Sequence, residues 1–247
     1  MKVEFLGGAR EVGRSALLVD DALLLDYGIL TGNPPRFPVG DVDPDAVVVS
    51  HGHLDHAGAV PALLSGDDRP TVHWTPPTRE LTLTLARDTL KLHGGSYDCP
   101  FTEAEVKRVT QVSETHGYRE TFEAAGYEVT FYNAGHIPGS AHVLVDDGDT
   151  RLLYTGDFYT DAPESDDAAG RAESRGGSVG GQRLVRGTTA RPDADVVVCE
   201  STYAGVEHDD RGAVEERFVE SVETTLWEGG TVVVPAFAIG RTQEMLL

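Results

Sequence analysis

Lysine and cysteine are scarce in this sequence. Lysine occurs only as Lys2, Lys91 and Lys107, whereas Asp and Glu together number 41 and the formal net charge is −21. Cys99 and Cys199 stand far apart and form no C-x-x-C pair, so we expect two small core residues rather than a disulfide framework or a thiolate metal site. Any metal ligand must therefore be a histidine or a carboxylate.

Long hydrophobic runs are absent as well. No apolar run approaches the roughly 18 residues that a membrane-spanning helix needs, and the start of the chain has no basic region followed by an apolar stretch. We therefore expect a cytoplasmic protein with no membrane partner. The hydrophobic share of 40% over 247 residues is enough for one large domain, or for one domain and part of a second.

The acidic composition bears on the choice of partner. A net charge of −21 ordinarily argues against nucleic acid, because an acidic surface repels phosphates. Many carboxylates with few lysines are, however, typical of a salt-adapted surface, and at about 1 M salt the Debye length is only about 3 Å. Composition therefore does not exclude an RNA partner.

Short apolar runs predict strands and amphipathic stretches predict helices. The expected strands are 3–6, 16–19, 22–25, 46–49, 127–132, 142–145, 151–154, 194–199 and 231–234. The expected helices are 56–64, 78–92, 102–110, 210–227 and one from 241 onward. This order predicts a layered α/β domain with sheets inside and helices outside, in which the last two strands flank a β-α-β crossover.

A dense group of candidate metal ligands follows the expected strand 46–49. His51, His53, Asp55 and His56 lie within six residues, where the strand turns into a helix. Residues two apart in an extended chain project to the same side, so His51 and His53 can bind one ion while Asp55 and His56 face a second. Zinc accepts imidazole and carboxylate ligands when thiolates are absent, so the motif predicts a metal centre.

Three further residues end apolar strands. His136 lies in a Gly-rich turn and can complete a three-histidine set for the first ion, and Asp157, also in a Gly-rich turn, can bridge both ions. Taken alone, each of the two also fits an ordinary turn residue. Asp26 closes the strand 22–25. We expect it to hold the segment 51–56, called the ligand loop below, by hydrogen bonds.

The other histidines lie in no ligand spacing. We expect a structural or surface role for His73, His93, His116 and His208. His142 follows the turn after His136, and for it both a packed imidazole and an approach to the site stay open.

With these residues in order, the chain resembles the metallo-β-lactamase superfamily from Met1 to about Glu200, which implies an αββα sandwich. The segment 6–15 is similar to the start of archaeal β-CASP proteins, nucleases related to the endonuclease of the pre-mRNA cleavage and polyadenylation machinery. Glu200 and the three residues after it resemble the acidic motif that opens the β-CASP region, and 234–241 resembles its next strand and helix.

The resemblance implies two domains, a metallo-β-lactamase domain at 1–200 and a partial β-CASP domain at 201–247. Within the first, the stretch 161–181 is rich in Asp, Glu, Ala, Ser and Gly and has no apolar period, so we expect a mobile acidic loop.

In that family two zinc ions activate a water molecule that attacks phosphorus in RNA or single-stranded DNA. The resemblance thus implies a zinc-dependent ribonuclease of the mRNA 3′-end-processing kind, with Asp55 and Asp157 taking part in catalysis and Glu200 orienting a histidine of the β-CASP domain. The family pattern also requires two further histidines beyond Leu247, and none follows His208. We therefore expect this chain alone to bind metal imperfectly and to cleave RNA weakly or not at all.

Two alternatives stay open. One is a thioester, lactone or lactam hydrolase on the same scaffold, since an activated hydroxide attacks carbonyl carbon as readily as phosphorus. The other is a non-catalytic RNA-binding scaffold subunit. The segments 200–203 and 236–241 favour the nuclease, because a small-molecule hydrolase has no need of them. The oligomeric state is open, with a homodimer as one alternative.

Overall fold

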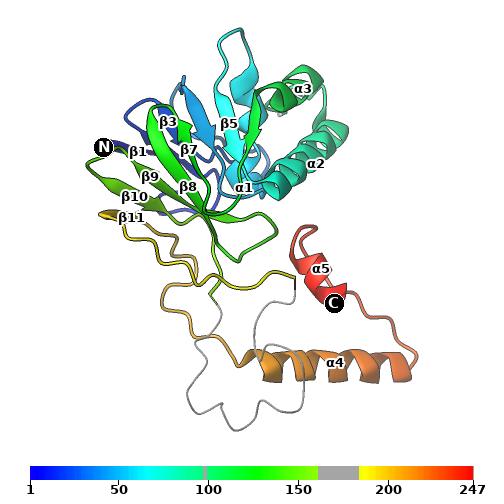
Figure 1. Cartoon of the computed structure of the whole chain (residues 1–247). Coiled ribbons are helices and arrows are strands. Elements are labelled where there is room, and N and C mark those ends of the chain that lie inside the picture. Colours follow the sequence, from blue (N-terminus) through cyan, green and yellow to red (C-terminus); the bar gives the residue numbers. More distant parts are fainter. Residues whose placement is uncertain (97–98, 161–183, 247) are drawn as a thin grey trace.

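The computed structural model describes residues 1–96, 99–160 and 184–246. It contains two β-sheets stacked face to face, with helices on the outer side of the first sheet (Figure 1). The first sheet has the strand order β1 (Val3–Gly7), β2 (Ala16–Val19), β3 (Leu23–Leu25), β4 (Ala46–Val48), β5 (Thr71–Trp74) and β6 (Ser113–Thr115).

The second sheet has the order β11 (Val196–Val198), β10 (Arg151–Tyr154), β9 (Ala141–Asp146), β8 (Tyr127–Asn133) and β7 (Thr121–Ala124). The helices are α1 (Leu54–Ala57), the 3₁₀-helix η1 (Val60–Leu64), α2 (Pro76–His93), α3 (Glu103–Val112), α4 (Arg211–Trp227) and α5 (Arg241–Leu246). This mixed α/β architecture confirms the expected fold class.

Strands β2, β3 and β4 of the first sheet are buried on both faces, which explains why they appear in the sequence as continuous hydrophobic runs. Strands β3 to β6 are parallel. In β3, Leu23 and Leu25 point into the core between the two sheets, and Leu24 points into the core beneath the helices. All three side chains are fully buried.

The helices over this sheet begin at capped positions. Helix α2 starts with Pro76, whose fixed φ suits the first helical turn, and the Thr75 hydroxyl accepts a hydrogen bond from the backbone N–H of Thr78. Helix α3 begins with a capping box between Thr102 and Glu105. These caps fix where each helix starts relative to the strand ends.

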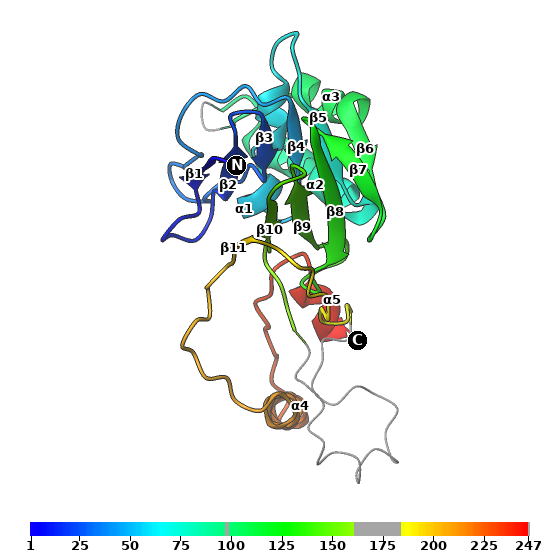
Figure 2. The same cartoon turned by 60° about the vertical axis from the view of Figure 1, so that its left-hand side comes forward.

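The topology brings three loops to one end of the sandwich. Strands β8 and β10 are both antiparallel to β9, so the C-terminal ends of β8 and β10 lie at the same end of the second sheet (Figure 2). The backbone N–H of Ala141, at the start of β9, donates to the carbonyl of Ser50, which follows β4 in the first sheet. The loops after β4, β8 and β10 therefore meet, and these loops carry the candidate ligands.

The structure corrects several sequence-based expectations. Strands β5, β6 and β7 were not expected, because they are short and their sequences are partly polar. The expected strand 231–234 and its β-α-β crossover were wrong for the described residues, since 231–234 has no partner strand there and Val233 is 83% exposed. Cys199 is exposed rather than in the core. The expected acidic loop 161–181 lies outside the described residues.

Helix α4 lies away from the sandwich (Figures 1 and 2), and its side chains Phe218 and Trp227 are exposed. Helix α5 instead lies beside the end of the sandwich where the loops meet. Across the described residues, none of the helices combines the length and the hydrophobicity that crossing a bilayer would take.

Leu24→Ala is expected to lower the free energy of unfolding by about 2–5 kcal/mol, because it leaves a cavity in the core between the first sheet and the helices that cover it. Leu92→Ala on α2, where the side chain is 67% exposed, should change it by no more than about 0.5 kcal/mol. Urea unfolding of the two variants measures the difference. Equal effects would mean that Leu24 does not occupy the packed position described here.

Candidate metal centre

The ligand loop is held against the turn that follows β3. A Cβ atom at Gly28 would lie 1.7 Å from the carbonyl oxygen of Asp55, so only glycine allows the two backbones to pass this closely. The same carbonyl oxygen accepts a hydrogen bond of 2.8 Å from the backbone N–H of Ser15, and the N–H of Tyr27 donates to the carbonyl of His56. The start of α1 is thereby fixed from two sides.

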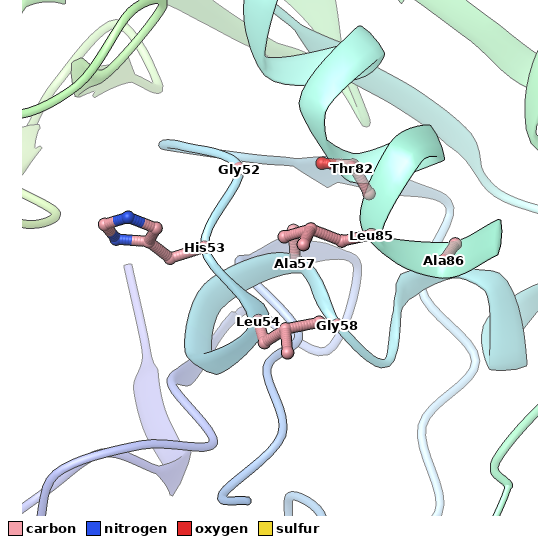
Figure 3. Close-up of a pocket in the computed structure, with 8 residues that line it drawn as sticks. All are labelled: Gly52, His53, Leu54, Ala57, Gly58, Thr82, Leu85 and Ala86. Carbon is pink, nitrogen blue, oxygen red and sulfur yellow. The ribbon is translucent and has the colours of Figure 1, made fainter. Parts of the chain in front are cut away.

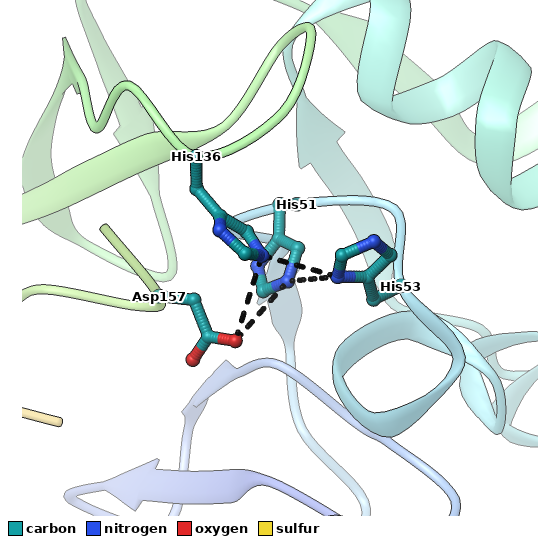
Figure 4. Close-up of side chains that lie close together, drawn as sticks. All are labelled: His51, His53, His136 and Asp157. Carbon is teal, nitrogen blue, oxygen red and sulfur yellow. Dashed lines mark hydrogen bonds and ion pairs between the residues drawn. The ribbon is translucent and has the colours of Figure 1, made fainter. Parts of the chain in front are cut away.

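Three histidines and one aspartate converge at the end of the sandwich (Figure 4). The Nδ1 atom of His53 lies 3.2 Å from Nε2 of His51 and 3.2 Å from Nε2 of His136. The Oδ2 atom of Asp157 lies 3.8 Å from the first of these Nε2 atoms and 3.7 Å from the second. Four donor atoms from three separate loops thus surround one point.

The hydrogen bonds behind these rings decide which nitrogen atoms carry protons. The Ser50 hydroxyl donates to the carboxylate of Asp26 at 2.7 Å, so its oxygen is left to accept from Nδ1 of His51 at 3.1 Å. The backbone of Ile239, just before α5, also acts on the ring of His53 and raises its pKa, against the larger opposing effect of burial. With the proton of His51 on Nδ1, its Nε2 presents a lone pair towards Nδ1 of His53 at 3.2 Å.

The protonation states also suit a cation. Burial lowers the pKa of His51 and of His53, and burial together with the neighbouring histidines holds the pKa of His136 at about 4, against the opposing effect of Asp157. Neutral imidazoles are the form that binds metal. Zinc–nitrogen bonds of about 2.0–2.1 Å in a tetrahedron would separate the donor atoms by about 3.3 Å, close to the distances found here. The donor set therefore fits a metal ion.

A second group shares one member with the first. Asp55, His56 and Asp157 place their donor atoms within 4.8 Å of one another. Oδ1 of Asp157 lies 3.3 Å from Nε2 of His56, while its Oδ2 faces the first group. Although burial opposes the charge, the carboxylates of Asp26 and Asp157 raise the pKa of His56 well above its usual value. In return, despite its own burial, Asp157 has a pKa lowered to about 2 by His56 and the other histidines.

Asp26 holds both groups in place without joining either of them. Its buried carboxylate accepts hydrogen bonds from the backbone N–H and the hydroxyl of Ser50, both at 2.7 Å. It also lies 2.7 Å from Nδ1 of His56 and accepts from the Tyr154 hydroxyl at 2.8 Å. These contacts suit the positioning role expected for Asp26 from the sequence, and that role stays a prediction.

Two other candidates lie outside these groups. The carboxylate of Glu200 accepts a hydrogen bond from the backbone N–H of Thr202, and its role towards a histidine stays a prediction. His142 is buried, with Nδ1 2.8 Å from the carbonyl of Thr155, so the packed alternative holds for this residue.

The structure also brings together residues that sequence spacing did not connect. His73, Glu114 and His116 form a third group of possible ligands. His73 lies on β5, Glu114 on β6 and His116 directly after β6, so only the pairing of β5 with β6, which was not expected, would have indicated their proximity.

A small hollow lies between the ligand loop and α2 (Figure 3). Its other lining residues are mostly apolar, among them Leu54, Ala57 and Leu85, and the ring of His53 points away from them. This hollow is therefore a packing feature behind the ligand loop, and the other candidate metal ligands lie on the opposite side of His53.

Comparison with known proteins agrees with this geometry. The family model described as the metallo-beta-lactamase superfamily matches residues 10–201. The chain is 37% identical over 252 residues to "RNase aCSPSF2" of Saccharolobus solfataricus, and 31% identical over 258 residues to "Probable RNase MJ4" of Methanocaldococcus jannaschii. It is 34% identical over 266 residues to "Transcription termination factor FttA" of Methanothermobacter thermautotrophicus.

The three alignments cover 99%, 100% and 98% of this chain, but 47%, 56% and 38% of the relatives. The chain thus spans about half the length, or less, of the curated relatives it matches. The relatives confirm the resemblance to the β-CASP branch that the sequence indicated.

Asp26→Asn is expected to weaken the binding of divalent metal by about 10–100-fold, because an amide presents an NH₂ group where the carboxylate accepts hydrogen bonds from Ser50, His56 and Tyr154. Asp88→Asn on the exposed side of α2 is the matched control and should leave the affinity unchanged. Calorimetric titration with metal compares the two variants. Wild-type affinity in Asp26→Asn would show that the carboxylate does not position the ligands.

Proposed function

Because the chain belongs to the metallo-beta-lactamase superfamily, we propose that it carries the metal centre of a zinc-dependent ribonuclease that hydrolyses phosphodiester bonds in RNA. The observation that carries the proposal is the pair of ligand groups joined through the two oxygens of Asp157. The names of the two RNase relatives support RNA as the substrate.

In this proposal His51, His53 and His136 hold one zinc ion, Asp55 and His56 hold a second, and Asp157 contacts both. Zinc in such a site lowers the pKa of a bound water towards about 7 and polarises a phosphoryl oxygen. The chain itself orients the ligands. Ser50 fixes the tautomer of His51, and Asp26 keeps a proton on Nδ1 of His56 so that Nε2 is turned towards Asp157.

The three donors of the second group leave room for a ligand from outside this chain. We propose that residues outside this chain supply it and that Glu200 orients a histidine among them. A cytoplasmic location belongs to the same proposal. Single-stranded DNA is an alternative substrate and a homodimer an alternative assembly, and neither changes the assignment of ligands.

Direct coordination of a phosphate oxygen by the metal ions would also explain how an acidic chain binds RNA. The described groups around the site are histidines and carboxylates, and the chain has a net charge of −21. Attraction of the phosphate must therefore come from the ions and from the few nearby cations, such as Arg241, whose charge acts on His136.

The activity is tested on the full protein, with labelled single-stranded RNA, single-stranded DNA and a β-lactam as separate substrates in the presence of zinc. RNA cleavage is expected, and Asp157→Asn should reduce it by about 100-fold or more, because one substitution perturbs both ions. Asp149→Asn, in the exposed turn before β10, is the matched control and should retain the activity.

Hydrolysis of the β-lactam without RNA cleavage would favour the small-molecule hydrolase instead. RNA binding without cleavage in the wild-type protein would favour the scaffold. Full activity in Asp157→Asn would contradict the assignment of the shared ligand.

His53→Ala is expected to lower the zinc content after dialysis by about one equivalent, because its Nδ1 lies between two of the other donor atoms. His208→Ala removes an exposed imidazole that belongs to none of the described ligand groups, so it should leave the zinc content unchanged. Elemental analysis of the two variants measures this difference. Unchanged zinc in His53→Ala would remove the residue from the ligand set.

A further inference from the structure

A second cluster of metal-binding side chains lies at the edge of the first sheet. Strands β5 and β6 are parallel, and His73 is the direct neighbour of Glu114 in their register. His116 stands two residues after Glu114, and its backbone N–H continues the ladder by donating to the carbonyl of Trp74. Residues paired in register, or two apart on one strand, share a face of the sheet, so the three side chains lie together.

The distances within the cluster suit a metal ion. Nδ1 of His73 lies 3.0 Å from Nε2 of His116 and 3.8 Å from Oε2 of Glu114, and all three donor atoms lie within 4.8 Å of one another. Two imidazoles and a carboxylate around zinc, with bonds of about 2.0–2.2 Å, require separations of about 3.3 Å. Small rotations of the exposed Glu114 side chain would satisfy the longer distances.

The surroundings hold the two rings rigidly in place. The ring of Phe122 on β7 stacks on His116 with 3.6 Å between centroids and an angle of 6° between planes, and it also stacks on His73 at 5.2 Å. His73 is buried, whereas Glu114 is 59% exposed. The cluster therefore combines a fixed pair of imidazoles with a carboxylate that reaches solvent, which gives an ion a route of entry.

Charge also favours a cation at this position. The carboxylate of Glu120 is held by the backbone N–H of Gly117 at 2.8 Å, and its charge, like that of Glu114, acts on His116. Burial and the neighbouring His116 lower the pKa of His73 to about 4, so its ring is neutral at physiological pH and its nitrogen is free to bind metal.

We propose that His73, Glu114 and His116 form a structural zinc site, separate from the candidate metal centre, that fastens edge strand β6 to β5. Without the ion, an N–H of one ring donates to the facing nitrogen of the other. With the ion, that proton shifts to the second nitrogen of the same ring, so both imidazoles stay neutral and both lone pairs face the metal. Water completes the coordination.

The test uses a background in which the candidate centre is disabled. The substitutions His53→Ala and Asp157→Ala remove donors of both of its groups, and both side chains are partly exposed, so little packing is lost. His116→Phe added to this background keeps an aromatic ring to stack on Phe122 but removes the ligand nitrogen. Zinc binding to each protein is measured by calorimetry, and thermal unfolding by circular dichroism.

We expect the background protein to bind one zinc equivalent and to gain about 5 °C or more in Tm when zinc is present at 100 times its Kd. The added His116→Phe should abolish both the binding and the gain, while Tm without zinc stays close to that of the background. Absence of zinc binding in the background protein would overturn the site, and so would binding that persists after His116→Phe. Either result leaves the ribonuclease proposal untouched, because that proposal depends on the ligands removed in the background.

Discussion

The carboxylate of Asp26 is the point on which the candidate metal centre depends. It is fully buried at the end of β3 and accepts hydrogen bonds from Ser50, at the start of the ligand loop, and from Tyr154 on the second sheet. A buried charge is stable only when its hydrogen-bonding capacity is filled, and here the groups that fill it are the ones whose orientation the site requires. The residue also has φ of +60°, an unfavourable value for a side chain with a Cβ atom, which the four contacts stabilise.

The sandwich provides the framework for this arrangement. Strand β4 of the first sheet leads into the ligand loop, and the second sheet contributes His136 after β8 and Asp157 after β10. The positions of these residues relative to one another are set by two apolar cores, one between the sheets and one beneath the helices. The site is therefore assembled from rigid strand ends, which suits donor atoms that must meet within a few tenths of an ångström.

Much of the fold and of the candidate site was predictable from the sequence, for identifiable reasons. Strands buried on both faces, such as β3, appear as unbroken apolar runs, and the dense motif at 51–56 is visible without any structure. The polar edge strand β6 has no such pattern, so the meeting of His73 with His116 was hidden. The expected strand 231–234 failed because hydrophobic content alone does not provide a hydrogen-bonding partner.

The backbone of Ile239, just before α5, acts on the ring of His53 in the loop after β4. The next residue, Gly240, packs on the same end of the sandwich. A Cβ atom added to Gly240 would lie 3.0 Å from the side chain of Ile137. Short docked segments generally open at a lower free energy than global unfolding. The orientation of one ligand imidazole is therefore subject to an equilibrium that leaves both sheets intact.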